Sequence, residues 1–165
     1  MPGGTDTLPV ESKASVHVSP SAPRTGAGNA VILCVERDPY VRELETYFLT
    51  EAGFGVTFAE DGLQALELAQ QLHPTIVITE ILVPKLDGLA LCRRLKSDPA
   101  TSDIAVLVFS LLAAERRAQD AGADAFLNKP LTSQGLKDAV RRLLARRAVK
   151  ETLRHPSPLS TEKPQ

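Results

Sequence analysis

Short apolar runs alternate along this chain with longer segments whose apolar residues recur at helical spacing, and this alternation restricts the fold more than any other feature. The clearest runs are residues 31–35, 76–82 and 104–109. Nearly continuous apolar runs of this length are typical of parallel strands, because helices cover both faces of a parallel sheet. Strands that alternate with helices connect through crossovers on those faces. The sequence therefore predicts a doubly wound parallel α/β sheet.

The segments between the apolar runs predict amphipathic helices. Asp38 is a suitable N-cap, and Pro39 a suitable first residue, for a helix after the first run. Asp61 and Gly62 open a second helix, and a third is expected over residues 87–96. The apolar stripes expected to face the core are Val41, Leu44, Phe48, Leu49 and Ala52 in the first helix, Ala65, Leu68, Ala69 and Leu72 in the second, and Leu136, Ala139, Val140, Leu143 and Leu144 in the last.

Composition narrows the class of protein. The net charge is −1 and aromatic residues make up only 4%, so overall charge does not indicate nucleic acid as a partner. Cys34 and Cys92 lie in an apolar run and a helix, and the three histidines are dispersed, which argues against a metal site. No apolar stretch is long enough to span a membrane, and the N-terminus lacks the apolar core of a signal peptide. We expect a cytoplasmic protein without a cofactor.

The two ends of the chain differ in composition from its centre. Residues 1–29 are rich in Pro, Gly, Ser and Thr and contain no aromatic residue, and residues 151–165 carry three prolines. Such segments cannot bury enough surface to offset the entropy of ordering them. The sequence therefore predicts one domain over residues 30–150 between two disordered tails, with no second domain in either tail.

Four motifs follow the apolar runs in order. They are Glu36-Arg37-Asp38-Pro39, Glu80 with the later Pro84-Lys-Leu-Asp87-Gly88, Ser110, and Phe126-Leu-Asn-Lys129-Pro130. Taken together, these motifs resemble the receiver domain of response regulators, of the kind found in chemotaxis regulators, over about residues 30–150. The resemblance implies five parallel strands in the flavodoxin-like order 2-1-3-4-5, with helices on both faces.

Ligands of such sheets gather beyond the carboxyl ends of the strands. Five polar residues are expected to converge there: Glu36, Arg37, Glu80, Ser110 and Lys129. The resemblance implies a pocket in which two acidic residues and a phosphoacceptor aspartate hold Mg²⁺. It also implies that the lysine pairs with phosphate oxygens and that the hydroxyl residue moves towards them.

Two residues depart from the family pattern. Arg37 takes the place of the second acidic residue, and a guanidinium about 4 Å from a divalent cation is repelled by roughly 8 kcal/mol at an effective dielectric of 20. Glu80 takes the place of the phosphoacceptor aspartate. We therefore expect no metal, and a glutamate that reaches Arg37 and Lys129. Glu80 either imitates the phosphorylated state or only holds the two cations together.

The surface that would transmit the signal also departs from the family. Ser110 keeps the hydroxyl, whereas Leu111 replaces a small residue and is expected to cover the pocket. Phe126 stands at the aromatic switch position, and the Lys129–Pro130 peptide is expected to be cis as in the family. Between Ser110 and Gly122 the chain is about one helical turn shorter than in a typical receiver.

Three classes of function remain open. The first is a stand-alone binding module, not an enzyme, that docks a histidine kinase, an effector or a second copy of itself without phosphorylation. The second is a conventional receiver that a histidine kinase phosphorylates. The third is a nucleic-acid-binding protein that uses the basic residues of the last helix. Two points argue against it: the sequence offers no base-reading element, and a run of charges on a helix is usually just a solvated face. Its basic residues would be Lys137, Arg141, Arg142, Arg146, Arg147 and Lys150.

Overall fold

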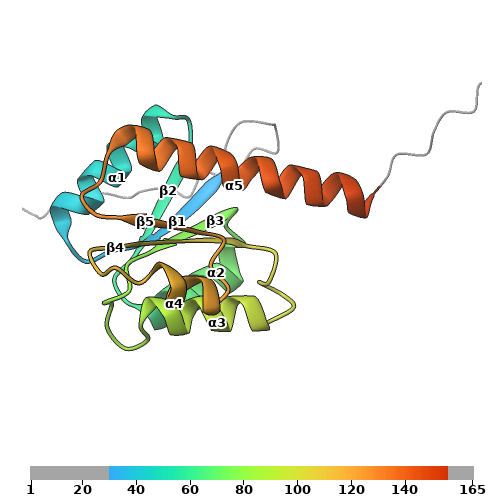
Figure 1. Cartoon of the computed structure of the whole chain (residues 1–165), viewed down its shortest axis with the longest axis horizontal. Coiled ribbons are helices and arrows are strands. Elements are labelled where there is room, and N and C mark those ends of the chain that lie inside the picture. Colours follow the sequence, from blue (N-terminus) through green and yellow to red (C-terminus); the bar gives the residue numbers. More distant parts are fainter. Residues whose placement is uncertain (1–29, 156–165) are drawn as a thin grey trace, which may run out of the picture.

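The computed structural model describes residues 30–155, and this part of the chain forms a parallel sheet between two layers of helices (Figure 1). The sheet has five strands in the order β2-β1-β3-β4-β5, so the predicted strand order is confirmed. At its centre the last residue of β1 pairs with the last residue of β3, Val35 with Thr79. The strands are β1 (Val31–Val35), β2 (Gly55–Ala59), β3 (Ile76–Thr79), β4 (Ala105–Ser110) and β5 (Ala125–Asn128).

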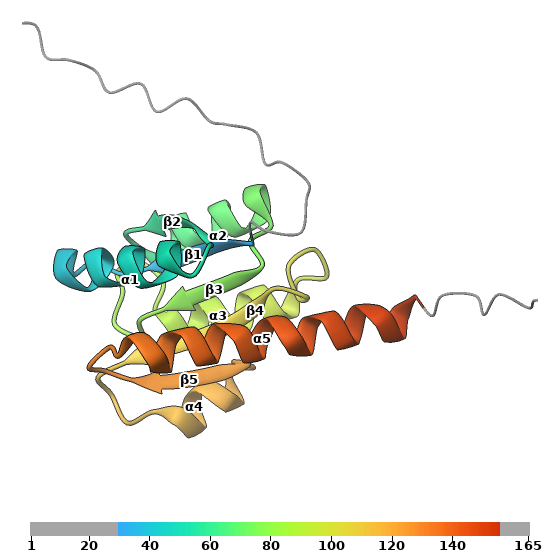
Figure 2. The ribbon, with the colours of Figure 1, turned by 90° about the horizontal axis from the view of Figure 1, so that it is seen from above.

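The helices divide between the two faces of the sheet, as doubly wound connections require. In Figure 1, α1 and α5 lie on one face, and α2, α3 and α4 lie on the other. Figure 2 shows that α5 also runs past the end of the sheet. The helices are α1 (Pro39–Glu51), α2 (Gly62–Leu72), α3 (Gly88–Ser97), α4 (Glu115–Asp120) and α5 (Ser133–Arg154).

Alternate side chains of the strands build two apolar cores. In β1, Leu33 packs into the core under α2, α3 and α4, and Ile32 packs into the core under α1 and α5. Because both faces of the sheet are covered, the central strands are almost wholly apolar. This explains why short, continuous apolar runs in the sequence correspond to strands.

Local side-chain contacts define where most of the helices begin. The Asp38 carboxylate accepts hydrogen bonds from the backbone N–H groups of Tyr40 and Val41, and Pro39 occupies the first turn of α1, as predicted. Asp87 caps α3 in the same way, and Asp61 accepts from the N–H of Gln64 in α2. The short α4 begins at Glu115, and its N-cap residue, Ala114, makes no side-chain capping bond.

The predicted apolar stripes were partly wrong. Leu44 is 43% exposed, whereas Glu45 is 1% exposed and occupies the buried position of that turn of α1. The inward positions of a helix follow its rotation, so one residue's shift in phase exchanges these two side chains. Leu72 is 46% exposed because it is the last residue of α2.

Two predicted boundaries also need correction. The third strand ends at Thr79 and not at residue 82, because the chain turns there and the N–H of Gly88 bonds the carbonyl of Ile81. The predicted tail from residue 151 was wrong for residues 151–154, which continue α5 to Arg154. The predicted disorder of residues 1–29 and 156–165 lies outside the described residues. Among the helices of the described residues, none is both long and apolar enough to cross a membrane.

Candidate functional site

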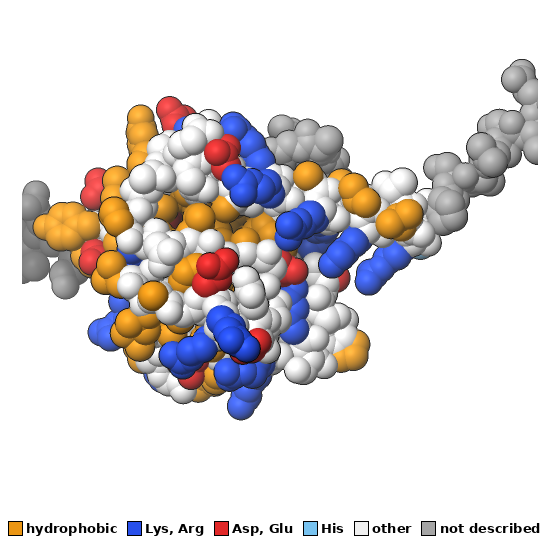
Figure 3. Space-filling model, in the orientation of Figure 1, with side chains coloured by type: hydrophobic (Ala, Val, Ile, Leu, Met, Phe, Trp, Pro, Cys, Tyr) orange, Lys and Arg blue, Asp and Glu red, His pale blue; other side chains and the backbone are white. Residues whose placement is uncertain are grey.

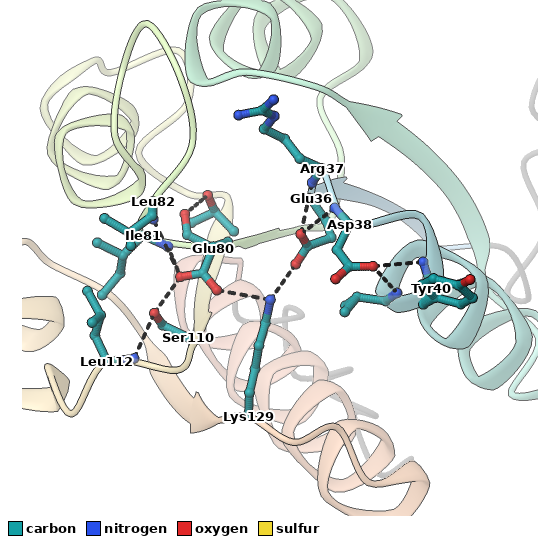
Figure 4. Close-up of polar contacts among 12 residues, drawn as sticks. Glu36, Arg37, Asp38, Tyr40, Glu80, Ile81, Leu82, Ser110, Leu112 and Lys129 are labelled. Carbon is teal, nitrogen blue, oxygen red and sulfur yellow. Dashed lines mark hydrogen bonds and ion pairs between the residues drawn. The ribbon is translucent and has the colours of Figure 1, made fainter.

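The carboxyl ends of the central strands bring a group of polar side chains together, as expected for this topology. Glu36 follows β1, Glu80 follows β3, Ser110 ends β4 and Lys129 follows β5. Figure 4 shows these four side chains pointing towards one another. Apart from Arg37, the residues chosen from the sequence therefore form one site.

Lys129 lies between two carboxylates. Its Nζ atom is 2.7 Å from Oε2 of Glu36 and 3.0 Å from Oε2 of Glu80. The lysine and Glu80 side chains are each only 10% exposed, so water screens these pairs weakly. Burial acts to lower the pKa of Lys129, but the bonds to Glu36 and Glu80 outweigh it and raise that pKa. Lys129 is therefore charged, and its charge is shared by both carboxylates.

The other oxygen of Glu80 is held by donors from two strand ends. Oε1 accepts a short hydrogen bond from the Ser110 hydroxyl and further bonds from the N–H groups of Ile81 at 2.6 Å and Leu82 at 3.4 Å. Burial acts to raise the pKa of Glu80, but the Ser110, Lys129 and Ile81 donors together lower it below its ordinary value. Glu80 is therefore an ionised carboxylate with both oxygens engaged.

Glu36 is fixed by its own backbone. Its Oε1 accepts from the N–H groups of Arg37 at 2.8 Å and Asp38 at 2.9 Å, which leaves Oε2 for Lys129. The side chain is buried. These backbone bonds fix the orientation of the Glu36 carboxylate, which is the second anion of the site.

Arg37 does not join the site, so the predicted contact between Arg37 and Glu80 was wrong. The residue is exposed, and Figure 4 shows its guanidinium directed away from Glu80. Successive side chains of an extended chain point to opposite sides, so a buried Glu36 turns Arg37 outwards. Among the described residues, Lys129 is the cation that contacts Glu80.

The donor set does not fit a magnesium ion. Mg²⁺ prefers an octahedral set of oxygen ligands, but Glu36 and Glu80 already share the Lys129 ammonium between them. Asp38 is committed to capping α1. Within residues 30–155, no group of three or more His, Cys, Asp or Glu side chains is placed to hold a metal. A lysine therefore takes the role of counter-ion to both carboxylates.

The loops beside the site differ from expectation. Leu111 is 76% exposed and does not cover the carboxylates, because the N–H of Leu112 bonds the Ser110 hydroxyl and turns the chain outwards. Phe126 is half-buried and packs against the core under α2, α3 and α4. The Lys129–Pro130 peptide is cis as expected, and Pro130 is exposed. The α4 helix has six residues, in keeping with the short spacing after Ser110.

Glu45 is a titratable residue near the site that the sequence interpretation missed. Its side chain is buried, and within the described structure its Oε2 atom has no hydrogen-bond partner. Burial, and then the charge of Glu36, raise the pKa of Glu45 to about 8. Its spacing of four residues from both Val41 and Leu49 could have revealed it, since both of these face the core.

The comparison with known families agrees with the geometry. The family model described as response regulator receiver domain matches residues 32–141. The chain belongs to this family. A receiver domain accounts for the parallel sheet, the polar site at its carboxyl edge and the lysine after β5.

Known receivers share both sequence and fold with this chain. The DNA-binding dual master transcriptional regulator RpaA of Synechocystis sp. is 36% identical over 118 residues, which are 70% of this chain and 49% of RpaA. Response regulator MprA of Mycobacterium leprae is 39% identical over 116 residues, 70% of this chain and 51% of MprA. The receiver domain of a histidine kinase from Syntrophus aciditrophicus is 31% identical, with a TM-score of 0.66, and the match covers 84% of this chain and 98% of that domain. The chain spans about half the length of these two curated relatives.

Proposed function

We propose that this receiver domain acts in two-component signalling by binding a protein partner without being phosphorylated, with Glu80 in place of a phosphorylated aspartate. The observation that carries the proposal is the double engagement of Glu80 by Ser110 and Lys129. In the family pattern, these two residue types contact a phosphoryl group. Here a permanent carboxylate already occupies both of them.

Glu80 is poorly suited to attack a phosphodonor. A nucleophile needs a free oxygen aligned with the phosphorus, and small errors in placement cost much of the rate. Both oxygens of Glu80 accept bonds, and the lowered pKa means that the carboxylate is a weak base. These features favour a structural anion over a phosphoacceptor.

The imitation of phosphate is partial. A carboxylate supplies one negative charge and two oxygens, against roughly −1.5 to −2 and three oxygens for a phosphoryl group. Glu80 nevertheless draws in the Ser110 hydroxyl and, through it, the N–H of Leu112. The loop after β4 is therefore held by the same anion that replaces the phosphate.

Exposed leucines beside the site offer a contact surface for a protein. Leu82 lies two residues after Glu80 and is 69% exposed, and Leu111 and Leu112 follow Ser110. Apolar side chains grouped on a surface are typical of protein interaction sites. The proposed partner is a histidine kinase or an effector protein of the cytoplasm, and the domain itself performs no catalysis.

A conventional receiver, phosphorylated at Glu80 by a histidine kinase, is the second candidate. Relatives named response regulators favour it, and so does the presence of Ser110 and Lys129. Incubation with acetyl phosphate and Mg²⁺, followed by intact-mass measurement at neutral pH, separates the two. We expect no added mass. A gain of one phosphoryl group that is absent in Glu80→Gln would establish the conventional function.

The proposed role of Glu80 predicts a loss of partner binding when its charge is removed. Immobilised wild-type domain, Glu80→Gln and Glu60→Gln are compared for capture of partners from cell extract, followed by titration of the captured protein. Glu60 is the matched control because its side chain is 77% exposed and lies outside the site. We expect weaker binding only for Glu80→Gln. Equal binding by all three would mean that Glu80 has a structural role alone.

A further inference from the structure

We propose that the end of α5 docks on α1 of a second copy of this chain, giving a two-fold symmetric dimer. The proposal rests on two exposed helix faces that match in apolar character and charge. Neither face includes Glu80, so the proposal stands apart from the proposed function.

The end of α5 carries an uncovered face. Leu143 is the last fully buried residue of the helix, and Arg147 binds the carbonyls of Thr75 and Asp103. Beyond this point Val149 is 58% exposed and Leu153 is 76% exposed. Figure 3 shows hydrophobic and basic side chains together on this protruding end.

Basic residues share that face. Residues three and four apart lie on the same side of a helix, so Arg146, Lys150 and Arg154 form a row beside the row of Val149 and Leu153. Neither Lys150 nor Arg154 forms an ion pair with another residue of the described part of the chain. The α5 docking face is therefore apolar, and within the described residues the unpaired positive charges of Lys150 and Arg154 lie along one side of it.

The first helix carries the counterpart. Tyr40 is 78% exposed, Leu44 43% and Tyr47 61%, and their spacing of four and three residues places them on one side of α1. Glu43 belongs to the same α1 docking face and is exposed. The two tyrosine rings also suit contact with Arg or Lys side chains, since cations are attracted to aromatic faces. This surface is apolar, aromatic and acidic.

Charge favours contact between the α5 and α1 docking faces over contact between two α5 docking faces. Two α5 docking faces in contact would bring the Lys150 and Arg154 cations of both copies together. Like charges placed opposite one another cost energy and select against wrong partners. Contact between the α5 and α1 docking faces places cations against Glu43 and the tyrosines instead.

The positions of the two faces allow a closed dimer. Both helices start at the carboxyl edge of the sheet and cover the same face of it (Figure 1). The start of α1, with Tyr40, and the end of α5 therefore lie at opposite ends of one helical layer (Figure 2). A two-fold axis normal to this layer exchanges the two ends. Each α5 end then meets α1 of the other copy, and both contacts form at once.

Sedimentation of the full chain over a range of concentrations tests the proposal. We expect a monomer–dimer equilibrium whose dissociation constant rises at least about tenfold in Leu153→Ser and in Tyr47→Ser, as for truncation of a central contact. Leu72→Ser is the matched control, because Leu72 is exposed on α2 at the other side of the sheet. All three positions are exposed, so circular dichroism should show unchanged folds.

A mixing experiment tests the reciprocal contact. The heterodimer of Leu153→Ser with Tyr47→Ser keeps one intact α5–α1 contact, so it should form more readily than the homodimer of either variant.

A charge swap tests the pairing of the two faces. Glu43→Lys should weaken the dimer, and adding Lys150→Glu to this variant should restore association. A monomer at all concentrations, a dimer insensitive to Tyr47→Ser, or no rescue by Lys150→Glu would overturn the proposal. So would a monomer that binds short duplex DNA through Lys150 and Arg154.

Discussion

At the scale of single residues, Glu80 is the second of two carboxylates, with Glu36, that pair with the Lys129 ammonium. Glu80→Ala removes one of the two anions beside Lys129 and leaves the Ser110 hydroxyl without its acceptor. The expected loss of unfolding free energy is about 1–2 kcal/mol, between that of exposed and fully buried pairs. Chemical denaturation measures it, and Glu80→Asp should lose part of the same amount. Glu60→Ala is the exposed control, and equal stability of the Glu80 and Glu60 variants would contradict the prediction.

The pKa of Glu80 sets the pH at which this contribution disappears. Because the folded-state pKa lies below the ordinary value of 4.5, the ionised carboxylate stabilises the fold at neutral pH. This stabilisation is lost as pH falls through the folded-state pKa. The stability difference between wild type and Glu80→Gln should therefore shrink below pH 4.5. A difference that stays constant down to pH 3 or so would argue against an ionised Glu80.

Glu45 should affect the pH dependence of stability in the opposite direction, because its ionisation destabilises the fold. Its pKa is about 8 in the fold, against an ordinary value of 4.5, so the folded state binds a proton that the unfolded state releases between these values. Its contribution is fully present below the ordinary value and is lost as pH rises through the raised one. Glu36, Lys129, Cys34 and Arg42 are the groups that act on it.

Replacing Glu45 by glutamine removes the ionisation while keeping the size of the side chain. Glu45→Gln should therefore be more stable than wild type at pH 8, by about 4 kcal/mol, and similar to it near pH 4. Thermal or chemical unfolding across this pH range measures the effect. Glu67→Gln is the control, because Glu67 is exposed on α2 and lies outside the α1 docking face. A parallel pH profile for wild type and Glu45→Gln would contradict the raised pKa.

At the scale of elements, the loop from β3 to α3 positions Glu80 through a close backbone approach. A Cβ atom at Gly88 would lie 2.1 Å from the carbonyl oxygen of Glu80, which is main chain and cannot move aside as a flexible side chain would. Gly88 thus allows α3 to begin directly against the end of β3. The geometry of the site depends on this contact between two elements.

Gly88→Ala should destabilise the domain by about 2 kcal/mol or more, because relieving the clash displaces either α3 or the Glu80 backbone. Denaturation measures the loss, and amide shifts of Glu80 and Ile81 should report the displacement. Gly55→Ala is the control, since its Cβ would meet only Val31 Cγ2 at 3.8 Å. Similar stability of the two variants would show that the loop adapts without cost.

At the scale of the whole molecule, the folding equilibrium reports whether the site binds metal. A ligand that binds only the folded state raises its stability by an amount that grows with concentration. Because Glu36 and Glu80 already share the Lys129 ammonium, millimolar Mg²⁺ should leave the melting temperature of the wild type unchanged. Lys129→Met leaves two carboxylates without a cation, so Mg²⁺ should raise the melting temperature of this variant. A saturable rise in the wild type would contradict the prediction.

The sequence alone determined the architecture of this protein. Apolar runs buried on both faces, capping residues such as Asp38 and Asp87, and the order of motifs after each run are local properties that the chain carries with it. They were sufficient to predict a parallel sheet and the meeting of Glu36, Glu80, Ser110 and Lys129, and the order of the strands followed from the resemblance that the motifs carry. Parallel topology alone places these strand ends at one edge.

Only the tertiary structure decided how the side chains pair. Arg37 points outwards and Leu111 is exposed, because the conformation of each loop, and not its composition, directs its side chains. Glu45 is buried because the rotation of α1 against the sheet selects which residues face inwards. The charge of Lys129 could be assigned to Glu36 and Glu80 only from distances, since these residues are far apart in sequence and meet through the packing of three strands.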